Sequence, residues 1–227
     1  MQRSGFFGNL SGLAGWISRL AMLNLQWVSL NLPVLIIGFY ILFTPMETIL
    51  PIHFVLMLIW MPLVCLPSTI AVVIKIREWI VMKEHIGGQQ TYWSYLKENY
   101  SRKIFFSLWL TLYWFIWIAA FFFLNMLLPV LGTVLVFIGL VLFVYTLNSI
   151  SMYAHYDIPN RPLLKRTFSI TISSPFLFIA VLAINVFSWY FSVTVFPILI
   201  PFFTVSISLF VSFWVFYRAR LNANQNT

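Results

Sequence analysis

The side chains best suited to chemistry are scarce in this sequence. Among 227 residues there are five Asp and Glu, three His and a single cysteine, Cys65. An enzyme site needs a nucleophile with a base, a metal cluster or a pair of acids. The sequence has no His-Glu-x-x-His zinc motif, no Gly-x-Ser-x-Gly elbow and no phosphate-binding Gly-Lys-Ser/Thr loop. We therefore expect a protein that is not an enzyme, with no catalytic residue, no metal and no cofactor.

Uncharged polar residues inside long apolar stretches form a second group of candidates. In lipid such side chains are tolerated where they meet another helix or line a cavity. The group consists of Asn24, Gln26, Asn31, Ser68, Thr69, Asn148 and Asn185. It could surround a small cavity open to the cytoplasm, as in a permease for sugar-like solutes. Alternatively, these residues only bond helices together, which the absence of charged residues within the apolar stretches favours.

Two further polar patterns concern the packing of these stretches. Pro62 and Pro67 each remove a backbone donor and leave a carbonyl that needs a partner, which Ser68, Thr69 or the amides near residues 24–31 could supply. The stripe Thr204, Ser208 and Ser212 has four-residue spacing. It predicts close helix packing, either within the chain or in a homodimer.

The segment from Lys75 to Lys103 mixes aromatic and charged residues. It predicts two short interfacial helices around Gly87 and Gly88, with Thr91 capping the second helix. The aromatic side chains could form a membrane belt beside snorkelling Lys and Arg, or a docking surface for a partner. The docking candidates are Arg77, Trp79, Trp93, Lys97, Glu98, Asn99 and Tyr100.

A second basic loop contains Asp157, the only aspartate of the chain. We expect a structural ion pair of Asp157 with Arg161 or with a basic residue of the larger loop. The alternative is a proton relay or ligand site with His155.

The elements that must position these residues follow from composition. The chain is 62% hydrophobic and 8% charged, against about 25% charged in average globular proteins. These values exclude a soluble fold and a disordered chain, and the lone cysteine excludes a disulfide scaffold. The surrounding solvent must therefore be the lipid bilayer.

Three nearly charge-free blocks, 20–74, 104–156 and 167–217, define the spans. Each is too long for one helix of roughly 20 residues and suits two helices joined by a turn. We predict one all-α domain over residues 1–227, a polytopic membrane protein with six transmembrane helices in three hairpins. The expected spans are about 20–43, 49–74, 104–128, 130–153, 175–196 and 198–217.

The basic residues predict the orientation. All 13 Lys and Arg fall before, between or after the three blocks, and never at the turns inside them. Basic residues are retained on the cytoplasmic side, so both termini are expected there. The net charge of +8 is then a topology signal, and no nucleic-acid partner is expected. No cleavable signal peptide is expected either.

Several short motifs, in order along the chain, resemble the YesL-like integral membrane proteins of Gram-positive bacteria. They are Arg19, Leu20, Ala21, Asn24, Leu25 and Trp27; Pro67, Ser68, Thr69, Ala71, Arg77 and Trp79; Trp93, Lys97, Glu98, Asn99 and Tyr100; and Tyr156, Asp157, Leu164, Lys165 and Phe168. The chain departs from the family pattern at Glu78 and Leu96. The resemblance implies a bacterial plasma-membrane protein with a domain of unknown function, encoded beside carbohydrate ABC importers and two-component sensors.

These observations lead to one functional hypothesis and one alternative. The hypothesis is a non-enzymatic accessory protein that docks on a membrane complex, such as a carbohydrate ABC importer or its sensor kinase, through the 75–103 segment. The alternative is a small-solute permease that uses the polar residues inside the spans.

Overall fold

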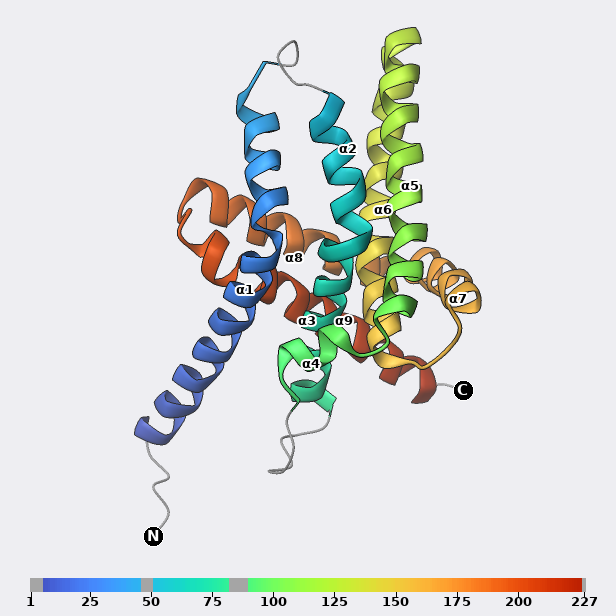
Figure 1. The fold of residues 1–227 in the computed structure, drawn as a ribbon. Helices are drawn as coiled ribbons and strands as arrows, with labels where there is room; N and C mark the ends of the chain where they lie inside the picture. Colours follow the sequence, from blue (N-terminus) through green and yellow to red (C-terminus); the bar gives the residue numbers. More distant parts are fainter. Residues whose placement is uncertain (1–5, 46–50, 82–89, 226–227) are drawn as a thin grey trace.

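The computed structural model describes residues 6–45, 51–81 and 90–225 of the chain. Within these residues the regular structure is entirely helical (Figure 1). The elements, with η marking a π-helical segment, are α1 (Phe6–Phe43), α2 (Pro51–Trp60), η2 (Met61–Cys65), α3 (Leu66–Val81), α4 (Tyr92–Lys97), α5 (Tyr100–Leu127), α6 (Pro129–His155), α7 (Asn160–Ser173), α8 (Pro175–Thr194), η3 (Ile200–Thr204) and α9 (Val205–Gln225).

Six helical stretches are long and apolar enough to cross a membrane. They are Ala14–Ile41, Ile52–Val81, Tyr100–Leu127, Val130–His155, Pro175–Thr194 and Ile200–Leu221. The prediction of an all-helical protein with six spans is confirmed, and the chain is a multi-pass membrane protein. The second span is longer than expected, because α3 continues to Val81 and carries Lys75, Arg77 and Glu78 on the same helix.

The helices pack around α3. Figure 1 shows α1, α2, α5 and α6 running along the molecule, with α8 and α9 lying across them, and the start of α1 and the end of α9 toward the same end. α5 packs along α6 and α8 along α9, while α3 contacts α5, α6 and α9. α1 makes its most extensive contacts with η3 rather than with α2. α3 is the buried centre, where Ile70, Ala71, Val72 and Ile76 are fully enclosed.

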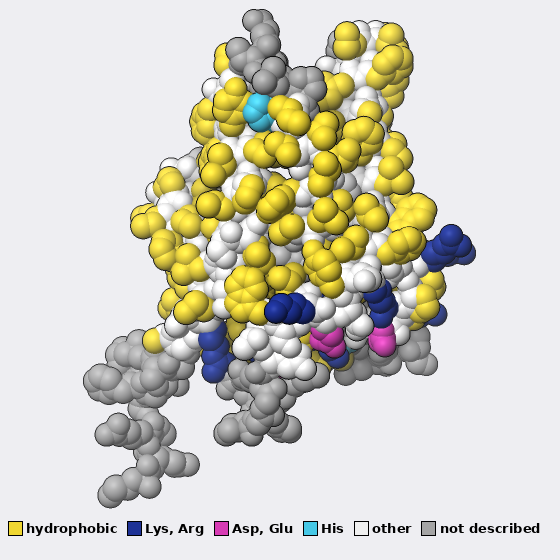
Figure 2. Space-filling model, in the orientation of Figure 1, with side chains coloured by type: hydrophobic (Ala, Val, Ile, Leu, Met, Phe, Trp, Pro, Cys, Tyr) yellow, Lys and Arg dark blue, Asp and Glu magenta, His cyan; other side chains and the backbone are white. Residues whose placement is uncertain are grey.

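The outer surface has two zones. Figure 2 shows apolar side chains over most of one face, with Lys, Arg, Asp and Glu gathered toward the lower end. Large apolar side chains such as Phe123, Phe137 and Phe187 are exposed. Such a surface would aggregate in water and is stable against lipid chains.

Glycines set the close approach of α5 and α6. A Cβ atom added at Gly139 would lie 2.5 Å from the Trp117 ring. The Trp117 indole N–H donates to the Leu135 carbonyl on α6 at 2.8 Å. Small residues allow such close helix contacts in membranes, so Gly139 fixes where Trp117 lies.

We expect Gly139→Ala to destabilise the protein by about 1–3 kcal/mol, because the added methyl group overpacks the α5–α6 contact. Gly15→Ala is the matched control, since nothing lies within 4 Å of a Cβ atom at Gly15. Unfolding by SDS in mixed micelles measures both variants. Equal effects at the two glycines would contradict the close packing at Gly139.

Candidate functional site

The polar residues inside the spans form separate groups of hydrogen bonds. Each group, called a joint, connects one helix to another element. The first joint is Asn24 on α1, which is fully buried against η3. Its side-chain amide N–H groups donate to the carbonyls of Ile200 and Pro201 at 3.0 and 2.7 Å, and its Oδ1 accepts the Ser206 N–H at 2.8 Å. Pro201 lacks the backbone N–H and forces a wider turn. Asn24 therefore satisfies the backbone groups that this irregular turn leaves unpaired.

The second joint lies beside the irregular turn η2, which contains Pro62. The hydroxyls of Ser68 and Thr69 donate to the Cys65 carbonyl at 2.8 and 2.7 Å. A helical N–H bonds the carbonyl four residues earlier, so Pro62 and Pro67 free the carbonyls of Leu58 and Leu63 rather than that of Cys65. The expectation that Ser68 and Thr69 bond the freed carbonyls is therefore not met at Leu63, which accepts from the Tyr100 hydroxyl instead.

Helix α1 completes the second joint. The Trp27 indole N–H donates to Thr69 Oγ1 at 2.9 Å, and the Asn31 amide donates to Ser68 Oγ at 2.9 Å. Asn24, Trp27 and Asn31 lie on one face of α1, and this face joins α1 to both irregular turns.

The remaining polar candidates bond other helix pairs. Asn148 on α6 donates to Thr171 Oγ1 on α7 at 3.0 Å. Asn185 on α8 donates to Ser212 Oγ on α9 at 2.7 Å and accepts from the Ser208 hydroxyl. Gln26 is half-buried, and its backbone carbonyl accepts a hydrogen bond from the Ser29 hydroxyl.

None of the seven polar candidates lines the cavities of about 840, 450 and 290 Å³ that lie among the described residues. Nor do three His, Cys, Asp or Glu side chains in this part of the chain lie together in a metal-binding arrangement.

The stripe of small residues at the end of η3 and along α9 is internal, which was one of the two expected alternatives. Thr204, Ser208 and Ser212 are all buried, and the Thr204 hydroxyl donates to Ser192 Oγ on α8 at 2.7 Å. The prediction of a homodimer through this stripe is wrong, because Ser192 and Asn185 on α8 have the matching seven-residue spacing and occupy it.

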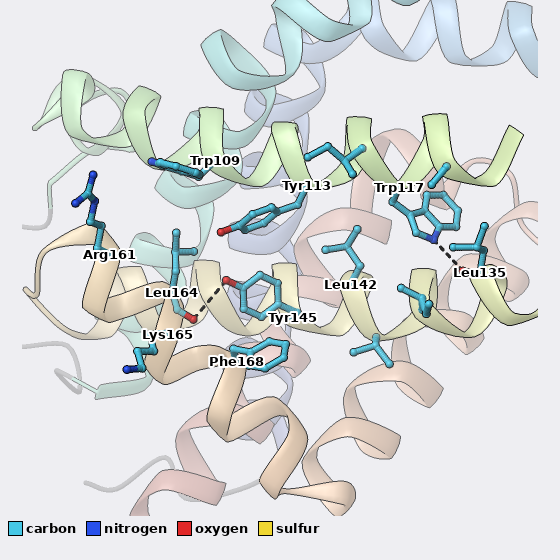
Figure 3. A pocket seen from close by; sticks show the side chains of 14 residues that line it. Trp109, Tyr113, Trp117, Leu135, Leu142, Tyr145, Arg161, Leu164, Lys165 and Phe168 are labelled. Atoms are coloured by element: carbon cyan, nitrogen blue, oxygen red, sulfur yellow. Dashed lines mark hydrogen bonds between the residues drawn. The ribbon is translucent and has the colours of Figure 1, made fainter. Parts of the chain in front are cut away.

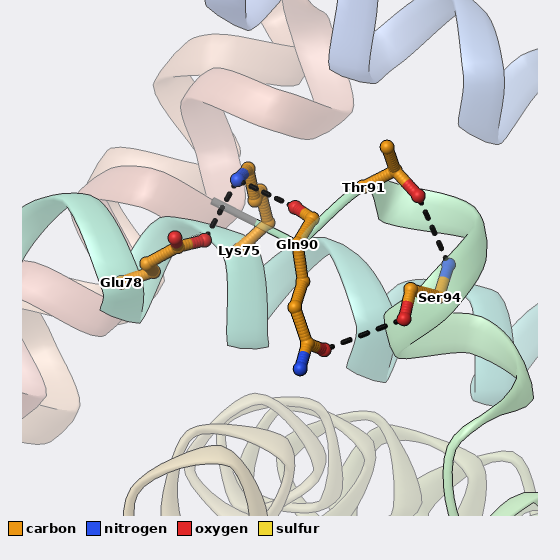
Figure 4. A network of polar contacts seen from close by, with 5 residues as sticks. All are labelled: Lys75, Glu78, Gln90, Thr91 and Ser94. Carbon is orange, nitrogen blue, oxygen red and sulfur yellow. Dashed lines mark hydrogen bonds and ion pairs between the residues drawn. The ribbon is translucent and has the colours of Figure 1, made fainter. Parts of the chain in front are cut away.

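At the charged end, hydrogen bonds of buried side chains hold α4 against the other helices. Thr91 caps it as expected, accepting the Ser94 N–H at 3.4 Å (Figure 4). Tyr92 is 3% exposed and donates to the Ser68 carbonyl at 3.5 Å. Lys103, 2% exposed, donates to the carbonyls of Glu98 and Tyr95. The Lys103 ammonium therefore neutralises the carbonyl end of α4.

A second buried lysine holds the segment that leads into α4. Lys75 on α3 donates to Glu78 Oε2 at 2.7 Å and to the Gln90 carbonyl at 2.8 Å (Figure 4). Sequence reasoning missed Lys75 and Lys103 because basic residues beside an apolar block usually snorkel to water. The expectation of a separate interfacial helix from Lys75 is wrong over the described residues, because α3 continues without a break to Val81 and buries Lys75. The Gly87–Gly88 hinge lies outside the described residues.

The tyrosines of α4 stay neutral near physiological pH. Burial raises the pKa of the Tyr92 phenol. Burial, and next the nearby Glu78 carboxylate, raises the pKa of Tyr95 to about 12.

The seven docking candidates separate into outward-facing and structural residues. Trp93, Lys97, Glu98 and Asn99 are exposed. The prediction that Trp79 belongs to the docking surface is wrong, because Trp79 is 8% exposed and packs edge-on against Trp16 with ring centroids 5.9 Å apart.

Arg77 and Tyr100 face the rest of the protein. Arg77 is half-buried and lines a polar cavity of about 290 Å³ between α3, the α4–α5 segment and the end of α6. Tyr100 is partly exposed, but its hydroxyl donates to the Leu63 carbonyl of η2. It is a second support for that irregular turn.

Asp157 pairs with a residue of the larger loop. Its carboxylate lies 2.5 Å from Arg102 at the start of α5, and Arg102 also donates to the Ile158 carbonyl at 2.5 Å. The predicted pair with Arg161 is therefore wrong. The backbone is extended at Tyr156 and Pro159, so Asp157 is separated from Arg161 in the first turn of α7. Asp157 is exposed, and such a surface pair adds little stability.

Comparison with protein-family models, curated proteins and solved structures gives no match for this chain.

We expect Asn24→Leu to lower the free energy of unfolding by about 2 kcal/mol, because two carbonyls and one N–H lose their partner inside the protein. Gln26→Leu, two residues away on α1, is the matched control and should change stability by less than about 0.5 kcal/mol. SDS-induced unfolding in mixed micelles separates the two outcomes. A neutral Asn24→Leu would mean that the carbonyls of η3 find other partners.

Proposed function

We propose that this multi-pass membrane protein is a non-enzymatic docking component of a larger membrane complex. Its six spans form three hairpins, and its charged end and both termini face the cytoplasm of a bacterial cell. The positive-inside rule supports this orientation, because the described Lys and Arg gather toward one end (Figure 2).

One observation carries the docking proposal. α4 is bonded on its inner side through Tyr92 and Lys103, while Trp93 on its outer side is 42% exposed beside Lys97 and Glu98. An aromatic side chain held in one position loses little conformational freedom on binding and is a common anchor of interfaces. Adjacent charges of both signs favour one orientation of the partner.

The partner we propose is a subunit of a carbohydrate ABC importer or its sensor kinase. This choice rests on the resemblance to the YesL-like family. The partner surface should offer an apolar pocket for Trp93, with an acidic group near Lys97 and a basic group near Glu98.

The permease alternative has less support in the geometry. Asn24, Asn31, Ser68, Thr69 and Asn185 are bonded to other helices or to backbone groups. A solute would have to break these bonds to reach them.

The docking proposal predicts that Trp93→Ala, or Lys97→Glu combined with Glu98→Lys, releases the partner while the protein still inserts and stays monodisperse. Tagged protein is extracted gently from its native membrane, and co-eluting proteins are quantified by mass spectrometry. Arg166→Glu, an exposed charge reversal on α7, is the matched control. An importer subunit or kinase that remains at wild-type stoichiometry with the Lys97 and Glu98 variant would contradict this surface.

The orientation predicts the labelling of introduced cysteines. Ser94→Cys on α4 should resist a membrane-impermeant maleimide in intact cells and react in inverted vesicles, whereas Leu128→Cys in the exposed α5–α6 turn should do the reverse. The native Cys65, at the end of η2 inside the second span, gives the background. Labelling of Ser94→Cys from outside would refute a cytoplasmic charged end.

A further inference from the structure

A large cavity lies between α5, α6 and α7 and is not lined by any residue of α4. Its volume is about 840 Å³, within the roughly 300–1,000 Å³ range of ligand sites. Figure 3 shows Trp109, Tyr113 and Tyr145 along it, with Trp117 at one end and Arg161 and Lys165 at the other. The groove is open at its side, because the lining residues Ile116, Ile138 and Phe168 are exposed.

The groove has the length of one membrane leaflet. Its lining on α5 extends from Trp109 to Ala120, and on α6 from Leu135 to Tyr145. At 1.5 Å per residue these segments are about 15–17 Å long. Half of the roughly 30 Å hydrocarbon core is about 15 Å. A side-opening apolar groove of this length fits the acyl chains of a single leaflet.

The charges at one end fit an anionic headgroup. Arg161, Leu164, Lys165 and Phe168 follow the i, i+3, i+4, i+7 spacing and lie on one face of α7. In an ordinary amphipathic helix this face would be apolar throughout, whereas here two of its four positions are basic. No acidic side chain lines the groove in the part of the chain that the structure describes. Asp157, the nearest acid in sequence, pairs with Arg102.

Arg161 also borders a second hollow. This hollow has a volume of about 450 Å³ and is lined by Phe105, Pro159 and Pro162, among others. The guanidinium group therefore stands between two apolar spaces. A phospholipid, with a single phosphate above two acyl chains, has the same arrangement of charge and apolar surface.

From these observations we propose that the α5–α6–α7 groove is a binding site for an anionic phospholipid. The acyl chain lies along Tyr113 and Tyr145, and the phosphate lies between Arg161 and Lys165. Basic pockets between transmembrane helices on the cytoplasmic side recognise anionic headgroups in this way. The hydroxyls of Tyr113 and Tyr145 point toward the basic end of the groove (Figure 3). The Tyr145 hydroxyl donates to the Leu164 carbonyl at 3.4 Å, which leaves the Tyr113 hydroxyl to donate to the ester region of the lipid. This site is independent of the docking surface on α4.

The test is native mass spectrometry of the full-length protein in detergent with dioleoyl phosphatidylglycerol or dioleoyl phosphatidylcholine. We expect the anionic lipid to be retained about 30-fold better, since each basic residue near the surface contributes roughly a fivefold preference. Arg161→Gln combined with Lys165→Gln should abolish this preference. Arg166→Gln, on another face of α7, should keep it.

Two further measurements of lipid retention test where the acyl chain and the phosphate bind. Ala120→Trp fills the groove and should reduce retention of both lipids, which tests the place of the acyl chain. Inorganic phosphate at millimolar concentration should not displace phosphatidylglycerol, because most of the lipid lies in the groove. Displacement by phosphate alone would identify a free-anion site and overturn the lipid assignment.

Other results would also overturn the proposal. Equal retention of the two lipids by the wild type is one, and a preference that survives the Arg161 and Lys165 substitutions is another. If a second copy covers the groove instead, the spectra will show a dimer whose lipid content does not depend on Arg161 and Lys165. Should the double variant not fold, the wild-type preference and the two single variants decide the question.

Discussion

The whole structure depends on one constraint: inside lipid, each backbone N–H and C=O group must find a partner in the protein. Regular helices meet this constraint alone, but the chain interrupts two of its spans with the irregular turns η2 and η3. The backbone of η3 finds its partner in Asn24 on α1, and the Leu63 carbonyl of η2 accepts from the Tyr100 hydroxyl. One face of α1 contacts both regions. Asn24 bonds η3, and Trp27 and Asn31 bond the residues that follow η2. This explains why α1 packs mainly on a segment 176 residues further along the chain rather than on its sequence neighbour.

The same constraint shapes the charged end. The short helix α4 has several carbonyls without a helical partner, and two of them receive the buried Lys103 ammonium. Lys75 does the same for Gln90, the residue before the cap Thr91. The two buried lysines therefore donate hydrogen bonds to backbone carbonyls. Lys97, Glu98 and Trp93 remain exposed on the outer side. The division between inner and outer residues leaves α4 with a fixed outward face.

The fold class was predictable from sequence because length and charge act globally. Segments that exclude charge over about 50 residues have few structural solutions in lipid. Individual contacts were not predictable. Pro201 lies inside the predicted last span, but no local pattern indicates that Asn24, on the first span, bonds its carbonyl. Asp157 is nearer in sequence to Arg161 than to Arg102, but an extended Pro159 segment separates the first two. Such partners are set by the packing of distant helices, which no local pattern encodes.

Three basic residues have different roles in the fold, although the topology rule alone explains all of them in the sequence. A basic residue beside a span is explained by the positive-inside rule alone, so Arg161, Lys165 and Lys103 look alike in the sequence. Their surroundings differ in the fold. Lys103 is enclosed by carbonyls, whereas Arg161 and Lys165 stand at the end of an open apolar groove without an acidic partner among the described residues. Retention on the cytoplasmic side requires only the charge, and any face of α7 would serve. Placement of both charges on the face that lines the groove is an additional feature, and lipid binding gives it a physical reason.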